Sequence, residues 1–113
     1  MNNDAHKHQA DRAGIYEEFR FINGKISWKS KDNAIWFLPK YNSWAIGSLE
    51  GIGEDIRGIS SHSRTGNGSP YDVPIKKWSY WDDGWNDITK SGDVIIECVQ
   101  GKICIKNISK TYA

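Results

Sequence analysis

The sequence contains no apolar run long enough to cross a bilayer and no excess of charge of either sign. Lysine and arginine total 15 residues and aspartate and glutamate total 14, which leaves a formal net charge of +1. A transmembrane helix needs about 20 consecutive apolar residues, and a dedicated nucleic-acid-binding domain carries a marked basic excess. The composition therefore predicts a soluble chain without membrane contact, and it disfavours a nucleic-acid partner.

The N-terminal segment, residues 1–13, has almost no large apolar side chain. A secretory signal peptide has a basic start followed by an apolar stretch, and this segment is polar instead. We interpret residues 1–13 as a disordered tail and residues 14–113 as a single β domain, and we expect the protein to be cytoplasmic. A chain of this length removes enough surface from water to fold without metal or disulfide staples.

Cysteine is scarce, because the chain has only Cys98 and Cys104, both within the Val/Ile-rich residues 94–108. Residues 100–102 interrupt this segment, which is typical of a final hairpin. A three-residue loop would place the cysteines opposite each other, whereas a two-residue loop would shift them by one position. The sequence leaves a disulfide open but favours a free thiol pair. It disfavours a metal site, since no second ligand pair accompanies the cysteines.

Helical patterning is also lacking. No segment has a sustained 3.6-residue apolar period, and residues 47–58 contain four glycines. Each glycine in a helix interior costs about 1 kcal/mol relative to alanine. These absences favour an all-β domain.

Tryptophan, by contrast, is abundant, with six residues in the chain. Trp28, Trp36 and Trp44 follow one another at eight-residue intervals, which is about the length of one strand and one turn. This spacing predicts aromatic anchors placed once per strand. Four tryptophans lie inside strand patterns and are expected in the core: Trp28, Trp36, Trp44 and Trp78.

Turn signals separate the strand patterns. Asn23-Gly24 accepts the left-handed backbone of a type I′ turn and predicts a hairpin of residues 16–22 and 25–29. Residues 34–38 and 44–46 predict a second hairpin. The predicted fold is an antiparallel meander or small barrel of about six to eight strands.

The later part of the chain is richer in loop residues. Residues 60–70 are mostly serine, glycine, arginine and asparagine, which predicts an exposed, mobile loop. A short strand is expected near residues 56–59 and another over residues 75–81. Asp82-Asp83-Gly84 then predicts a hairpin turn before Trp85.

Candidate catalytic and metal residues are few. His62 lies between serines, but a catalytic base needs a fixed partner and an orienting carboxylate, and we expect a glycine-rich loop to supply neither. A hydrolase remains a third alternative, which would require His62 to lie within hydrogen-bond reach of a carboxylate. The aspartates near Gly84 lack the full pattern of a calcium loop. We therefore predict no enzyme activity, no cofactor and no metal.

Exposed aromatic side chains are the remaining candidate site. Four aromatic residues occupy loop-like or outward positions: Tyr41, Tyr71, Trp81 and Trp85. Such side chains beside polar residues are typical of binding surfaces. The predicted binding residues are Trp81, Trp85, Tyr71, Asp83 and Arg64.

We consider three kinds of ligand for this surface. The leading hypothesis is a protein partner that contacts residues 60–73 and the aromatic side chains near Trp81 and Trp85. The alternative is a carbohydrate, which would need a flat, coplanar pair of exposed rings. In that case Trp81, Trp85 or Tyr71 would stack on sugars, and Asp82, Asp83 or Asn86 would bind hydroxyls. Single-stranded nucleic acid is the third possibility, through the aromatic side chains with Arg57, Arg64, Lys76 and Lys77.

Several short motifs together resemble one small β-module. They are Gly14-x-Tyr16, Asn23-Gly24-Lys25-x-x-Trp28, Ile35-Trp36-Phe37, Trp44-x-Ile46-Gly47 and Pro74 before Trp78. In that module a Gly-x-Tyr strand, an Asn-Gly-Arg-Pro-x-Tyr turn, an aromatic strand, a Trp-x-Ile strand and a late Pro…Trp recur. It resembles accessory domains of multidomain proteins from protists and marine invertebrates, which often adjoin kinase, ankyrin or ubiquitin-ligase-type regions. The resemblance covers roughly residues 14–98 and implies a small β fold and a non-catalytic role.

This chain departs from the module at three positions. Lys25 replaces its arginine, Ile26 its proline and Trp28 its usual tyrosine. The substitutions preserve the hairpin and packing roles, but they remove any function tied to the Arg-Pro pair. The resemblance therefore transfers no site residue.

Overall fold

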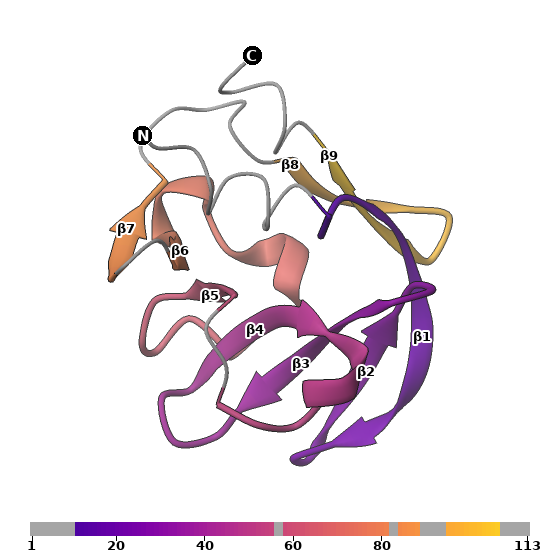
Figure 1. The fold of residues 1–113 in the computed structure, drawn as a ribbon, viewed down its shortest axis with the longest axis horizontal. Helices are drawn as coiled ribbons and strands as arrows, with labels where there is room; N and C mark the ends of the chain where they lie inside the picture. Colours follow the sequence, from indigo (N-terminus) through magenta and orange to yellow (C-terminus); the bar gives the residue numbers. More distant parts are fainter. Residues whose placement is uncertain (1–10, 56–57, 82–83, 89–94, 107–113) are drawn as a thin grey trace.

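The strands form one curled antiparallel sheet in this computed structural model (Figure 1). The structure describes residues 11–55, 58–81, 84–88 and 95–106. Within them, the strand order across the sheet is β7-β6-β5-β4-β3-β2-β1-β9-β8. Seven consecutive strands thus form a meander, and the C-terminal hairpin is added at the β1 side. The predicted all-β antiparallel meander is confirmed, with nine strands in the described residues where about six to eight were expected.

The elements are short, and every helix in the described part is a single three-residue 3₁₀ turn. The strands are β1 (Gly14–Ile22), β2 (Lys25–Lys29), β3 (Asn33–Leu38), β4 (Ser43–Ser48), β5 (Ile59–Ser61), β6 (Trp78–Trp81), β7 (Trp85–Asp87), β8 (Ile95–Val99) and β9 (Lys102–Lys106). The 3₁₀ turns are η1 (Leu49–Gly51), η2 (Pro70–Asp72) and η3 (Ile75–Lys77). None of these helices is long and apolar enough to span a membrane.

The first hairpin has the predicted turn. Ile22 pairs with Lys25, and the two residues between them have positive φ, 58° at Asn23 and 92° at Gly24. Both values fall in the left-handed region that a type I′ turn needs. The Asn23 side chain also donates to the carbonyls of Phe37 and Gly53, at 2.9 and 3.1 Å. The turn residue therefore joins this hairpin to the segment that follows η1.

The last hairpin resolves the register of the cysteines. Val99 pairs with Lys102, so the loop has two residues, Gln100 and Gly101, with φ of 52° and 80°. Cys98 consequently pairs with Ile103 and Cys104 with Glu97. Because consecutive residues of a strand point to opposite faces, the two thiols lie on opposite faces of the hairpin. Both cysteines are free, as the sequence favoured, but Cys98 is exposed, so the two thiols are not the packed, buried pair that was expected.

The concave face of the sheet holds the larger core. Trp28, Trp44 and Trp78 are buried there together with Tyr16 and six isoleucines. Figure 1 shows η2 and η3 between the β4 and β8 parts of the curled sheet, and Val73, between these two turns, is also buried in this core. The short helical segment therefore fills the inside of the half-barrel, and the prediction of core positions for these tryptophans is confirmed.

Trp36 belongs to a second, smaller core on the opposite face of the sheet. It is fully buried with Ala34, Leu38 and Ala45, and Ile22, Leu49 and Ile52 pack against them. The indole Nε1 donates to the Glu54 carbonyl at 3.0 Å. The segment 49–55 is therefore fixed over the outer face of β3 and β4, with the core position of Trp36 also as predicted.

Residues 60–70 are only partly the exposed loop that their composition predicted, since the exposed members are Ser63, Arg64, Asn67 and Gly68. Ser61 is the last residue of β5 and only 4% exposed, and Gly66 and Pro70 are buried. The Arg64 amide donates to the Tyr41 carbonyl at 2.9 Å, and the Gly66 amide donates to the Asn42 carbonyl at 2.8 Å. The small side chains that suggested a loop let this backbone pack closely against the β3–β4 turn. Composition was misleading because it reports polarity and not hydrogen-bond partners.

Two strands and the N-terminal tail have boundaries that differ from those predicted from the sequence. The strand expected over residues 75–81 begins only at Trp78, after the turn η3, and the strand expected near residues 56–59 is β5, at 59–61. Residues 1–10 of the expected tail lie outside the described part of the chain. The next residues contact the domain, since Arg12 Nη1 donates to Asn33 Oδ1 at 2.7 Å and Tyr16 donates to the Arg12 carbonyl.

Candidate functional site

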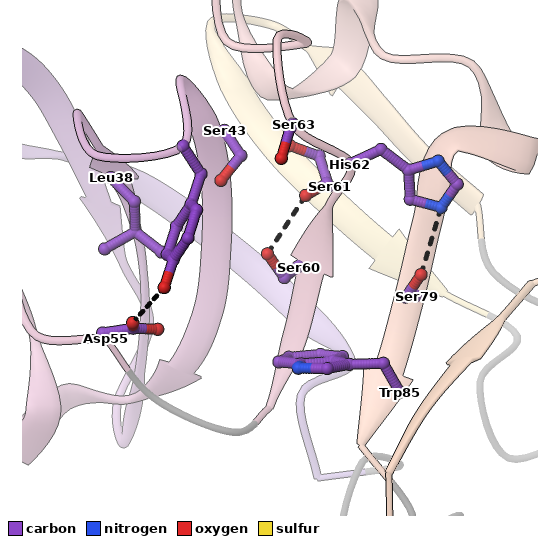
Figure 2. A pocket seen from close by; sticks show the side chains of 10 residues that line it. Leu38, Ser43, Asp55, Ser60, Ser61, His62, Ser63, Ser79 and Trp85 are labelled. Carbon is purple, nitrogen blue, oxygen red and sulfur yellow. Dashed lines mark hydrogen bonds between the residues drawn. The ribbon is translucent and has the colours of Figure 1, made fainter.

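A cleft of about 350 Å³ lies on the outer face of the sheet, across β4 to β7. Its floor includes a row of small side chains. Ser60 pairs with Ala45 on one side and Ser79 on the other, and Ser79 pairs with Asp87. Residues directly opposite each other in a sheet share a face, so these short side chains leave the surface hollow between taller neighbours. Figure 2 shows the residues around this hollow.

Two exposed aromatic side chains stand beside the floor. Trp85 in β7 is 46% exposed, and Figure 2 shows its ring edge-on, with one face toward Ser60. Its ring also contacts Trp81 edge-to-face, with centroids 5.5 Å apart and planes at 80°. Tyr41 is 37% exposed, and its hydroxyl donates to Asp55 Oδ2 at 2.8 Å. An aromatic wall thus faces a tyrosine–carboxylate pair across a serine-lined floor.

Ser43 contributes an unusual polar group to this cleft. It is 1% exposed, and its Oγ has no hydrogen-bond partner among the described residues. By contrast, Ser61 Oγ accepts from the Trp44 amide and from the Thr65 hydroxyl, both at 2.7 Å. Leaving a buried hydroxyl unpaired costs about 1 to 3 kcal/mol. The floor of the cleft therefore offers a hydrogen-bonding group that the fold itself does not use.

His62 is held in place by a carboxylate, contrary to the expectation from sequence. Its Nε2 lies 3.0 Å from Asp87 Oδ1 and 3.1 Å from Ser79 Oγ. Its backbone amide donates to the Lys77 carbonyl at 2.7 Å. The prediction that its loop would supply neither a fixed partner nor a carboxylate was wrong, because sheet pairing brings residue 87 beside residue 79, close to the end of β5.

The arrangement of these three side chains nevertheless differs from a catalytic triad. In a triad the serine and the carboxylate bind different nitrogens of the imidazole, whereas here Asp87 and Ser79 both contact Nε2. The Ser79 hydroxyl donates to Asp87 Oδ1 at 2.8 Å, so its proton points to the carboxylate and not to the histidine. Ser79 is also buried. The triangle links the end of β5 to β6 and β7.

The Asp87 carboxylate is stabilised in its ionised form. The Ser79 hydroxyl bond is the main cause that lowers its pKa below the ordinary value of 3.8, and His62 adds to it. A carboxylate that accepts hydrogen bonds in the folded state holds its proton less strongly. The Asp87 carboxylate therefore stabilises the fold at pH values above the pKa that it has in the unfolded chain. This stabilisation is lost as the pH falls through the lower pKa that it has in the folded protein.

We predict that the Ser79→Ala substitution raises the pKa of Asp87 toward 3.8, because it removes the main hydrogen-bond donor. The measurement is an NMR titration of the Asp87 side-chain carboxyl carbon in both proteins. The control is His62→Gln, for which we expect a smaller rise. An unchanged Asp87 pKa in the Ser79→Ala protein would show that the hydroxyl does not donate to this carboxylate.

The structure separates the residues predicted to form the site. Trp85 lines the cleft, and the Trp81 ring contacts the Trp85 ring. Tyr71 is in η2, packs partly buried against the inner core and does not line the cleft. Arg64 is exposed, with a φ of 70°, and does not line the cleft either. Asp83 lies outside the described residues.

Sequence reasoning missed most of the polar side chains that meet here. These are Ser43, Asp55, Ser60 and Ser79, which come from the three strands β4, β5 and β6 and from the segment that follows η1. A signal existed in the alternation within β6, which places Ser79 and Trp81 on one face and Trp78 and Tyr80 on the other. The partners of Ser79 on β5 and β7 depend on register, which the sequence did not fix.

A second hollow, of about 450 Å³, lies between β2 and residues 67–72. Phe21, which is largely exposed, and Pro70 help to line it. Trp28 also lines it, and its Nε1 has no hydrogen-bond partner among the described residues. Neither hollow contains a group of three metal-ligating side chains among the residues that the structure describes.

Comparison of the chain with family models, with curated proteins and with solved structures finds no match in any of the three. The motif resemblance to accessory β-modules is therefore neither supported nor contradicted by a relative. The function has to be argued from the cleft itself.

Proposed function

We propose that this protein is a non-catalytic interaction module and that the Trp85 cleft binds a segment of a partner protein. The observation that carries the proposal is the exposed Trp85 ring beside a hollow whose floor contains the unpaired Ser43 hydroxyl. Binding energy at protein interfaces concentrates in a few tryptophan, tyrosine and arginine side chains near pockets. A tryptophan with one face over a polar cleft fits that pattern.

A carbohydrate is the second candidate. The serine hydroxyls and the Asp55 carboxylate that line the cleft are groups that bind sugar hydroxyls, and they favour this candidate. The aromatic geometry counts against it, since the Trp81 and Trp85 planes lie at 80° and not parallel. The flat pair of rings that the sequence-based alternative required is absent at these two residues. A protein segment does not need a flat platform, so we favour the protein partner.

Two arguments support a non-catalytic role. The hydroxyl of Ser79 is directed to Asp87 and not to His62, which leaves the one serine–histidine contact in the cleft without a base for the serine. The motif resemblance to accessory β-modules points the same way. We accordingly propose binding without turnover, and no cofactor.

The test is the selection of peptides from a random library on the immobilised full chain. We expect enriched peptides to bind with affinities that fall about tenfold or more in the Trp85→Ala protein, because truncating an interface hot spot costs more than 1 kcal/mol. The matched control is Phe21→Ala, which removes another exposed aromatic ring outside this cleft. Isothermal titration of the purified variants with synthetic peptides gives the affinities.

Other outcomes are equally informative. Loss of peptide binding in Phe21→Ala but not in Trp85→Ala would place the binding site at the second hollow. Failure to enrich any peptide, together with binding of oligosaccharides that requires Trp85, would replace the protein partner with a carbohydrate. Either result would overturn the proposal.

A further inference from the structure

We propose that the Trp85 cleft recognises a cationic side chain, lysine or arginine, of the partner segment. This inference rests on the proposed function and names the chemistry of the residue that enters the cleft. The described lining contains a carboxylate and no lysine or arginine. Charge, aromatic geometry and hydrogen-bonding capacity each support it.

Two carboxylates lie at the cleft, and the second of them, Asp87, is paired with His62, which also lines the cleft. Asp55 lies on one side and is exposed, and Asp87 lies next to the floor residue Ser79, with its side chain 63% exposed. Asp87 is kept ionised by the bonds that lower its pKa. Opposite charges across an interface select partners and exclude like charges. A cation is therefore favoured over an anion at this position.

The Trp85 ring offers a favourable surface for a cation. The face of an aromatic ring carries a negative quadrupole, and tryptophan attracts cations most strongly of the aromatic side chains. One face of Trp85 is directed to the floor of the cleft (Figure 2). A lysine or arginine side chain placed between this face and Asp55 would contact the ring with its head group and its apolar stem.

The remaining polar groups supply acceptors for the N–H donors of such a head group. An ammonium has three donors and a guanidinium has five. Asp55 uses one oxygen to accept from Tyr41, and a carboxylate has about four lone-pair sites, so it can accept further bonds. Ser43 Oγ has no partner among the described residues and lies buried just beneath the floor, so it becomes an additional acceptor when a guest opens the floor around it.

A cation of the chain itself already lies near the cleft. Lys40 Nζ lies 5.4 Å from the centroid of the Tyr41 ring. Lys40 does not line the cleft. Its ammonium group therefore lies against the Tyr41 ring from outside the cleft, and the Trp85 ring remains exposed to the cleft. The guest is therefore expected on the Trp85 side.

The experiment uses blocked single amino acids as probes. Nα-acetyl-lysine methylamide and Nα-acetyl-arginine methylamide are titrated into the full chain and followed by the amide and indole signals in NMR spectra. Nα-acetyl-norleucine methylamide, which has a similar stem and no charge, is the matched probe. We expect the cationic probes to bind about fivefold more tightly than norleucine and to shift the Trp85 indole signal. This difference should diminish at high salt, since salt screens exposed charges.

Two variants test the residues that would hold the cation. We expect Asp55→Asn to weaken the lysine probe about twofold and Trp85→Leu about threefold, while both leave the norleucine affinity nearly unchanged. Glu18→Gln is the matched control for charge, because it removes an exposed carboxylate from β1, outside the cleft. The amide spectrum of each variant establishes that the fold is retained.

The outcomes distinguish this inference from the proposed function. Equal affinities for the lysine and norleucine probes, or no shift up to the solubility limit, would overturn the cationic guest. If the peptides selected on the chain then still require Trp85 but contain no basic residue, the interaction module stands and only the inference fails. If a methyl glycoside shifts the same signals more strongly than either cationic probe, both fail.

Discussion

Replacing Trp36 with alanine is expected to lower the free energy of unfolding by about 3 to 5 kcal/mol, the range for tryptophan-to-alanine changes in well-packed cores. Trp36 is fully buried, and its indole is the centre of the smaller core on the outer face. The substitution leaves a cavity between the sheet and segment 49–55. It also removes the bond from Nε1 to the Glu54 carbonyl. A small domain has only about 5 to 15 kcal/mol of stability, so the loss is a large fraction of the total.

The Trp36 substitution is also expected to affect the cleft. Glu54, whose carbonyl Trp36 binds, is adjacent to Asp55, whose carboxylate accepts from Tyr41. We therefore expect Trp36→Ala to disturb the Asp55 side of the cleft even at temperatures where the protein is still folded. Trp36→Phe, which retains most of the buried ring but not the hydrogen bond, should keep more of the stability.

Urea denaturation measured for each protein gives the free energies. Trp85→Ala is the matched control, because it removes the same side chain from an exposed position. We expect Trp85→Ala to lower the free energy of unfolding much less than Trp36→Ala does. Similar losses for the two alanine variants would show that the outer core contributes little to stability.

The parts of the fold that the sequence predicted correctly are those set by local backbone chemistry. Asn23 and Gly24 both have positive φ, which few other residue pairs adopt without strain. The first hairpin could therefore be located from these two residues. The tryptophans were placed in the core because aromatic side chains within strand patterns bury large areas. Each of these inferences needs only neighbouring residues.

The cleft could not be predicted in the same way because it depends on the register of non-local pairs. Ser60 meets Ser79 through the pairing of β5 with β6, which are separated by a long segment, and Ser79 meets Asp87 through the register of the β6–β7 hairpin. A register shift of one residue would turn each of them to the other face. His62 was set aside because its loop sequence is polar, whereas its carboxylate partner comes from a different strand, β7.

The segment 61–70, which is only partly exposed, shows the same dependence on distant contacts. Its serines and glycines indicated an exposed loop, but its backbone amides donate to the β3–β4 turn. At residue 66 a glycine is present because a side chain would prevent the two backbones from approaching so closely. This conclusion leads directly to a prediction at Gly66.

Replacing Gly66 with alanine is expected to destabilise the protein by about 1 to 3 kcal/mol, the range for overpacking a close contact. A Cβ at this position would lie 2.6 Å from Phe37 Cε1, 2.8 Å from Asn42 Oδ1 and 2.9 Å from the Asn42 carbonyl carbon. The last atom belongs to the backbone of the β3–β4 turn, so rotation of a side chain cannot relieve the contact. The shift would weaken the bond from the Gly66 amide to the Asn42 carbonyl, and the bond from Lys25 Nζ to the Gly66 carbonyl.

Gly68→Ala is the matched control for the Gly66 substitution. The three atoms nearest to a Cβ there all belong to the Asp72 side chain, with its carboxylate oxygen at 2.7 Å, and that carboxylate can rotate away. By rotating, the Asp72 carboxylate would lose the hydrogen bond that it accepts from the Ser69 amide, and this loss should cost about 1 kcal/mol or less. Urea denaturation of both variants tests the difference. If Gly68→Ala were the more destabilising change, the close approach of residue 66 to the β3–β4 turn would not be what holds segment 61–70 against the sheet.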